Sequence, residues 1–132
     1  MRTDHEALLV VYRPGPEFLV LLRTDAYWHL VAGGIEDDEL PEAAARRELE
    51  EETGLAMPED FMAIPLELGY MRPDETWITL HSYAAGAPGG WEPVLNEEHT
   101  EYVWCAERAA VDLLEYPEPR DALLFVAREL RA

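Results

Sequence analysis

The chain has 132 residues, 48% of them hydrophobic, which is enough for one domain with a buried core and too few for two ordinary domains. We therefore expect a single domain over residues 1–132. The formal net charge of −18 repels nucleic acid and anionic membrane surfaces, and so argues against polymeric nucleic acid and membranes as partners.

Targeting signals and cysteine content bear on the location and the redox chemistry of the chain. The first residues lack the apolar length and cleavage site of a signal peptide, and no later stretch approaches a membrane span. These features predict a soluble, cytoplasmic protein. Cys105 is the single cysteine, which excludes an internal disulfide and a cysteine-based zinc cage.

In chain order, residues 6–12 and 18–23 are rich in Val and Leu and flank a turn, which predicts two strands. Residues 31–39 indicate a glycine-containing loop. The segment Leu40–Thr53 predicts a helix, because Pro41 lies in its first turn and Gly54 follows its end. The remaining elements are predicted as strands at 64–70, 76–85 and 101–105, a turn-rich connection at 86–93, and helices at 107–116 and 120–130. This order favours a mixed sheet covered by helices.

The predicted helix and the loop before it are unusually acidic. Nine acids and two bases lie between Glu36 and Glu52. At about 100° per residue, three of the glutamates share one helix face: Glu48, Glu51 and Glu52. Like charges at this spacing repel, so the glutamates either extend into water or are held together by a cation. Carboxylate oxygens are ligands that suit Mg²⁺ or Mn²⁺.

A solvated acidic helix is the ordinary interpretation of such a charge run, but the spacing of the residues favours a specific site. The segment GGIEDDELPEAAARRELEEETGL matches the pattern G-x5-E-x7-R-E-U-x-E-E-x-G-U, where U is a bulky aliphatic residue. Its fixed positions are Gly33, Glu39, Arg47, Glu48, Leu49, Glu51, Glu52, Gly54 and Leu55. The segment therefore resembles the box of the MutT-like Nudix hydrolases, a match of nine positions over 23 residues.

This resemblance implies an α/β/α sandwich of the Nudix type and an enzyme that cleaves a diphosphate linkage by attack of water at phosphorus. It implies that Glu48, Glu51 and Glu52 are metal ligands, that one of them or a downstream acid activates water, and that the backbone carbonyl near Gly33 adds a ligand. It also implies that Arg47 orients the acids. Mg²⁺ or Mn²⁺ would let so acidic a site accept an anionic substrate.

Two further segments resemble the subgroup that contains the dihydroneopterin triphosphate and dATP pyrophosphohydrolases. The stretch YWHLVAGGIEDDE is similar to an aromatic-Trp-Gln motif of that subgroup, with His29 in place of the Gln. The stretch EEHTEYVWC resembles a segment of that subgroup and of diadenosine tetraphosphate hydrolases, and in the former the Glu before the His completes the metal site. The resemblance assigns that role to Glu98, with Glu97 as the alternative.

Three residues outside the box are candidates for substrate contacts. Arg23, at the end of the second strand, could meet a phosphate, or could be an ordinary surface charge. Trp28 and His29 could contact the organic group, or could be packed loop residues.

The sequence leads to one leading hypothesis and two alternatives. The leading hypothesis is a metal-dependent hydrolase that converts a nucleoside triphosphate or similar triphosphate to monophosphate and pyrophosphate. The alternatives are a pyrophosphatase of dinucleoside polyphosphates or nucleotide sugars, and a nucleotide-sensing module without catalysis. Whether two copies pair as a homodimer is left open.

Overall fold

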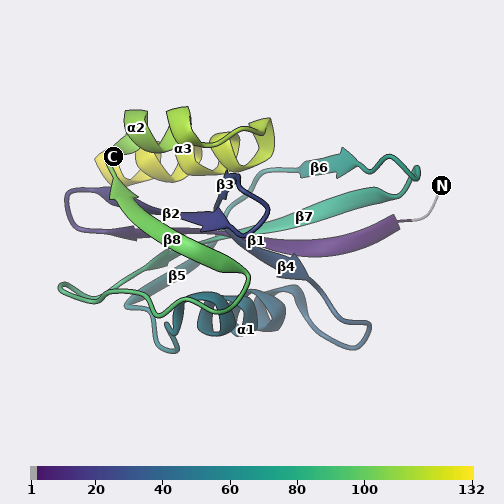
Figure 1. Cartoon of the computed structure of the whole chain (residues 1–132), viewed down its shortest axis with the longest axis horizontal. Coiled ribbons are helices and arrows are strands. Elements are labelled where there is room, and N and C mark those ends of the chain that lie inside the picture. The colour runs from purple at the N-terminus through teal and green to yellow at the C-terminus, as the bar shows by residue number, and fades with distance from the viewer. Residues whose placement is uncertain (1–2) are drawn as a thin grey trace.

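The structure, a computed structural model, describes residues 3–132. Its elements are β1 (Thr3–Arg13), β2 (Glu17–Arg23), β3 (Trp28–His29), β4 (Val31–Gly34), α1 (Pro41–Thr53), β5 (Asp60–Ala63), β6 (Leu68–Met71), β7 (Trp77–Gly86), β8 (His99–Cys105), α2 (Glu107–Leu113) and α3 (Pro117–Arg131). The strands form one 8-stranded sheet. Helices α2 and α3 cover one face and α1 covers the other (Figure 1), which confirms the expected α/β/α sandwich.

Strand β1 is the centre of this sheet. It pairs in parallel with β7 from Thr3 to Tyr12, and antiparallel with β2 and β4, so the sheet is mixed as predicted. Leu8 and Val10 pack in the core beneath α2 and α3, while Leu9 and Val11 pack in the core against α1. Burial of both faces explains the continuous apolar run in the sequence of this strand.

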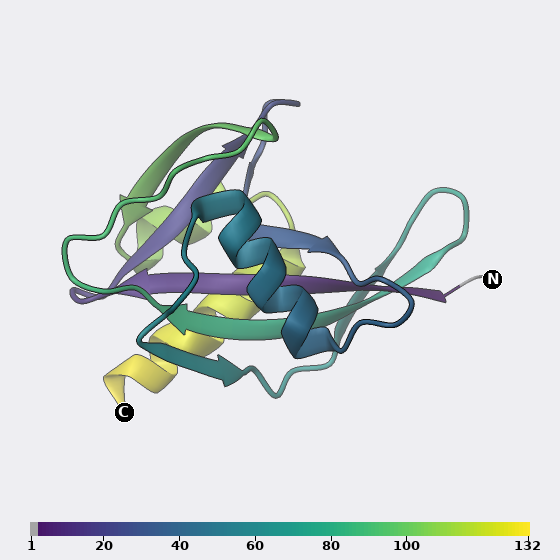
Figure 2. The same ribbon diagram turned by 90° about the horizontal axis from the view of Figure 1, so that it is seen from below.

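Helix α1 begins and ends where its sequence predicts. Leu40 is the extended residue before the helix, and Pro41 occupies the first turn, where a missing N–H costs nothing. Gly54 adopts a left-handed conformation with φ of 81° and donates its N–H to the carbonyl of Glu50, as is usual for a glycine that ends a helix. The helix lies across the sheet (Figure 2), over β1 and β4.

The prediction of a loop over residues 31–39 is wrong for its first part. Val31–Gly34 forms β4, and Ala7 of β1 pairs with Gly33. Trp28–His29 forms the short strand β3 against β2. Two adjacent glycines give no local strand signal. The segment forms a strand because it pairs with β1 along one edge.

The prediction of one strand at residues 64–70 is also wrong. Strands β5 and β6 lie one after the other along the same edge of β7, and Pro65 lies in the connection between them. Proline has no N–H for a strand ladder. Ile64, the residue before Pro65, donates its N–H to the carbonyl of Ser82, and the pairing with β7 is interrupted after it.

The two C-terminal helices differ from prediction at their facing ends. Helix α2 ends at Leu113 rather than at 116, and α3 begins at Pro117 rather than at 120. Proline is favoured in a first helical turn, which explains the earlier start. Within residues 3–132, no helix has the length and apolar character needed to cross a membrane.

Candidate active site

The inner face of α1 brings the box residues against β4. Ala44 and Ala45 are fully buried there, followed by Glu48 one turn later and by Glu52 two turns later. The small alanine side chains allow α1 to approach the sheet closely, and α1 contacts both β4 and β1. Two glutamates are thereby placed in the interface between a helix and a sheet, where water is largely excluded.

Arg47 connects the loop before α1 to the acids on it. Its guanidinium donates to both carboxylate oxygens of Glu39, at 2.7 and 2.8 Å, and to Glu48 at 2.8 Å. It also donates to Glu51 at 3.3 Å and to the carbonyl oxygen of Gly34 at 3.0 Å. Hydrogen bonding to Arg47 holds the pKa of Glu39 at about 2. Arg47 therefore contacts Glu39, Glu48 and Glu51 at once, and its role in orienting these acids stays a prediction.

We expect Arg47→Lys to lower kcat/KM by about 10- to 100-fold, the usual effect of losing a residue that orients metal ligands. A lysine ammonium keeps the charge but cannot bridge Glu39, Glu48 and Gly34 with a planar fork. Steady-state kinetics would measure the change. Arg46→Lys is the matched control, since Arg46 contacts Glu42 and the ring of Phe61 on the outer side of the helix. Equal losses in the two variants would contradict an orienting role for Arg47.

Gly33 and Glu48 are in close contact across the interface of β4 and α1. A Cβ atom added at Gly33 would lie 2.2 Å from the Glu48 carboxyl carbon and 2.3 and 2.5 Å from its oxygens. Such distances are far inside van der Waals contact, so any side chain at position 33 would displace the Glu48 carboxylate. The glycine of the box is therefore required by the position of its glutamate.

Glu52 is the most buried acid of the box, with 1% of its surface exposed. Its polar contacts include the adjacent Glu48 carboxyl group, the N–H of Ala32 at 3.4 Å and the buried side chain of His99 at 3.7 Å. Burial raises the pKa of Glu52 well above the ordinary value of 4.5, and the adjacent Glu48 raises it further. A carboxylate in this position needs either a proton or a cation beside it.

Glu51 and Glu98 lie at the rim of this pair. Glu51 is exposed and contacts Arg47. Glu98 lies in the loop before β8, and its backbone carbonyl accepts from the N–H of Thr24 at 3.0 Å. The charge of Glu98 contributes to the raised pKa of Glu52, so the loop acid and the helix acid share one electrostatic environment.

These residues fit a divalent cation by their chemistry. Two buried carboxylates, Glu48 and Glu52, face each other with Arg47 beside only one of them, and hard oxygen ligands are those that Mg²⁺ and Mn²⁺ prefer. Within residues 3–132 no three acidic, histidine or cysteine side chains are gathered into a complete metal cage. Arg47 contacts Glu48 and Glu51, so a bound cation would have to share these two carboxylates with Arg47.

A cavity of about 590 Å³ opens beside these acids, and Gly33 and Glu98 are part of its wall. Arg23 and His29, two predicted substrate contacts, also line it. Arg23 bonds to Asp25 at 3.2 Å. Burial lowers the pKa of His29, whose Nδ1 lies 2.9 Å from the carbonyl oxygen of Leu30.

Trp28 does not lie with Arg23 and His29, the other two predicted substrate contacts. It packs against the core on the side of α2 and α3, and the described wall of the cavity does not include it. Its role as a substrate contact stays a prediction.

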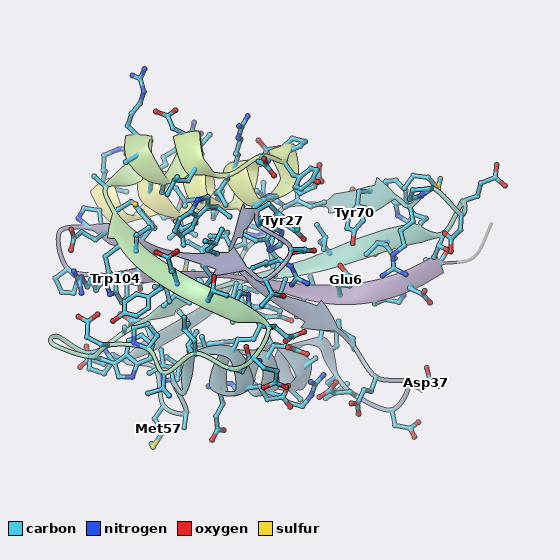
Figure 3. The ribbon with its side chains drawn as sticks, viewed as in Figure 1. Glu6, Tyr27, Asp37, Met57, Tyr70 and Trp104 are labelled. Carbon is cyan, nitrogen blue, oxygen red and sulfur yellow. The ribbon has the colours of Figure 1, made fainter. Side chains whose placement is uncertain are left out.

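The cavity wall also contains Tyr70 and residues that the sequence did not single out for this role: Glu6, Tyr27, Arg72, Tyr116 and Glu118. Figure 3 shows Glu6, Tyr27 and Tyr70 on β1, the connection after β2, and β6. Glu6 accepts from the hydroxyl of Tyr70 at 2.8 Å and from Arg72 at 2.9 Å. These residues come from distant segments, so no local pattern could have grouped them.

The α/β/α sandwich places a glutamate helix against a glycine strand beside a cavity, an arrangement that suits a divalent cation and a phosphorylated ligand. The family model described as the NUDIX domain matches residues 2–125. The chain therefore belongs to the Nudix family. Proteins of this family hydrolyse diphosphate linkages of nucleotide-like substrates and generally use divalent metal ions.

Individual relatives are more distant. An octanoyltransferase of Myxococcus xanthus is 30% identical over an alignment of 128 positions that covers 89% of this chain and 34% of that protein. The chain thus spans about a third of that relative. A dihydroneopterin triphosphate diphosphatase of Haemophilus influenzae is 27% identical over 92% of this chain and 86% of its own length. The solved dihydroneopterin triphosphate pyrophosphohydrolase of E. coli has a TM-score of 0.85 and 23% identity, with 97% and 99% of the two chains covered. That likeness supports the fold.

Proposed function

We propose that this Nudix hydrolase cleaves the α–β linkage of a nucleoside triphosphate or similar triphosphate, and releases a monophosphate and pyrophosphate. The observation that carries the proposal is the buried pair Glu48 and Glu52 packed behind Gly33, which together with Glu98 lines a cavity of about 590 Å³. The Haemophilus influenzae relative, whose name specifies a triphosphate substrate, supports this choice. A small phosphorylated substrate also agrees with the charge of −18, because bound cations would screen it.

In this proposal Mg²⁺ or Mn²⁺ would be held by Glu48, Glu51, Glu52, Glu98 and the carbonyl near Gly33. When bound, it would supply neutralisation of phosphate charge and a lower pKa for water. Arg47 keeps the Glu48 and Glu51 carboxylates in place, and one of the acids accepts the proton of the attacking water. Arg23, on the cavity wall next to Glu98, binds a phosphate oxygen, and the half of the cavity beyond His29 receives the organic group.

The test is a panel of nucleoside triphosphates, dihydroneopterin triphosphate, dinucleoside polyphosphates and nucleotide sugars, each with Mg²⁺ or Mn²⁺. Products are separated chromatographically, and the reaction is run in ¹⁸O-water to identify the attacked phosphorus. We expect triphosphates to give monophosphate containing ¹⁸O, together with pyrophosphate. Release of inorganic phosphate from triphosphates, or turnover confined to dinucleotides or nucleotide sugars, would contradict the proposal.

A further inference from the structure

The loop before β8 contains an asparagine whose side chain holds the adjacent acid in two ways. The Oδ1 atom of Asn96 accepts from the backbone N–H of Glu98 at 3.2 Å. Its Nδ2 atom donates to the Oε2 atom of Glu98, also at 3.2 Å. The first contact fixes the turn of the loop, and the second fixes the direction of the Glu98 carboxylate.

The same asparagine contacts His99, the first residue of β8. The Nδ1 atom of His99 lies 3.3 Å from the Oδ1 atom of Asn96, and the backbone N–H of His99 donates to the Asn96 carbonyl at 3.3 Å. The imidazole is buried, with 5% of the residue exposed, and its Nε2 atom lies 3.7 Å from the Oε1 atom of Glu52. Nε2 has no hydrogen-bond partner among the described residues.

These contacts determine the orientation of both side chains. Because the amide nitrogen of Asn96 donates to Glu98, the amide oxygen faces His99. An oxygen can only accept, so Nδ1 of His99 carries the hydrogen and Nε2 presents its lone pair to Glu52. A buried acceptor without a partner costs stability, so the fold keeps this imidazole beside Glu52 at that cost.

We propose that Asn96 is the positioning residue that holds the Glu98 carboxylate in place for a cation, while its contact with His99 keeps the buried imidazole packed beside Glu52. The inference rests on the proposed function, in which these two acids hold the same cation. Without Asn96, repulsion between the acids of the loop and the box favours an outward rotation of the Glu98 side chain.

Backbone contacts hold the loop independently of the Asn96 side chain. Thr24 donates its N–H to the carbonyl of Glu98 at 3.0 Å, and Val94 donates to the carbonyl of Thr53 at 2.8 Å. These bonds attach the loop to β2 and to the end of α1. Substitution of Asn96 is therefore expected to leave the fold intact and to release a side chain.

The experiment measures Mn²⁺ binding by electron paramagnetic resonance without substrate, and kcat and KM for the best triphosphate. Asn96→Ala is expected to weaken Mn²⁺ binding about 10- to 100-fold, with little change in nucleotide KM once Mn²⁺ is saturating. Asn96→Asp keeps the oxygen that caps the turn but places a carboxylate beside Glu98, so it is expected to bind Mn²⁺ no better than the alanine variant. Recovery of wild-type binding by Asn96→Asp would overturn the proposal, because only the turn would then matter.

A double-mutant cycle isolates the route through Glu98. If Asn96 acts on that carboxylate, adding Asn96→Ala to Glu98→Gln lowers Mn²⁺ affinity much less than it does in the wild type, whereas independent residues give additive losses. Glu101→Gln, an exposed acid on β8, controls for the change in charge, and melting curves verify folding. Additive losses would overturn the proposal.

Separate outcomes test the ligand role of Glu98 and the positioning role of Asn96. If Glu98→Gln binds Mn²⁺ as the wild type does, the ligand role of Glu98 in the proposed function is wrong, and the inference falls with it. If Glu98→Gln weakens binding but Asn96→Ala does not, the inference alone is overturned.

Discussion

Glu52→Gln is expected to lower kcat by about 10²–10³-fold or more, the loss found when one preorganised electrostatic contact is removed. Glu52 is 1% exposed and lies between β4 and His99. A neutral amide of the same shape fits this space but cannot neutralise a cation. The expected loss is therefore one of chemistry rather than of folding.

The measurement is kcat with saturating Mg²⁺ on the best substrate of the panel, together with Mn²⁺ binding. Glu50→Gln is the matched control, because Glu50 lies on the exposed side of the same helix and its substitution changes the net charge equally. Full turnover by the Glu52 variant would rule out the assigned metal mechanism.

The raised pKa of Glu52 also leads us to expect that the stability of the metal-free protein depends on pH. Burial, and then Glu48, raise the pKa of Glu52 above its ordinary value of 4.5, so the folded protein holds this proton more tightly than the unfolded chain. Its stabilising effect is complete below about pH 4.5 and is lost as the pH rises towards the higher folded-state pKa.

Thermal melts without metal should therefore show a Tm that falls as the pH rises from about 5 to about 9. For one proton, the unfolding equilibrium constant changes by at most about tenfold per pH unit. Glu52→Gln should flatten this slope and melt higher than the wild type at the alkaline end. Mg²⁺ should stabilise the wild type most at high pH, since a cation replaces the proton. An unchanged slope in the variant would show that Glu52 is not the responsible group.

Gly33→Ala is expected to have the next largest effect, with a fall of about 100-fold in kcat, the size that follows from a misplacement of about 1 Å. The added Cβ would lie 2.2 Å from the Glu48 carboxyl carbon, so Glu48 must leave its place beside Glu52. We also expect a loss of about 1–3 kcal/mol in unfolding free energy from overpacking. Urea unfolding and Mn²⁺ binding measure the two effects.

The neighbouring glycine offers a control for Gly33→Ala. A Cβ at Gly34 meets no atom within 4 Å, so Gly34→Ala changes the backbone of β4 in the same chemical way without touching Glu48. It should retain most of the activity and stability. Similar losses in both variants would mean that flexibility of the strand, rather than the Glu48 contact, is what the glycines provide.

Local sequence was informative wherever a short segment decides the outcome by itself. The start and end of α1 follow from Pro41 and Gly54, and the spacing of the acids places Glu48 and Glu52 on the buried face. Residues 64–70 and 31–34 were assigned wrongly because strand pairing is decided by partners far along the chain, β7 and β1.

The sequence by itself therefore determined the family, the reaction class, and the box acids as candidates, since all of these depend on spacing within one helix and its loop. Only the tertiary structure decided what surrounds them. It brought the loop residues Asn96 and His99 to Glu98 and Glu52, and assembled the cavity from β1, β6 and the start of α3. The physical reason is that a helix carries its own periodicity, whereas a cavity exists only where separate elements meet.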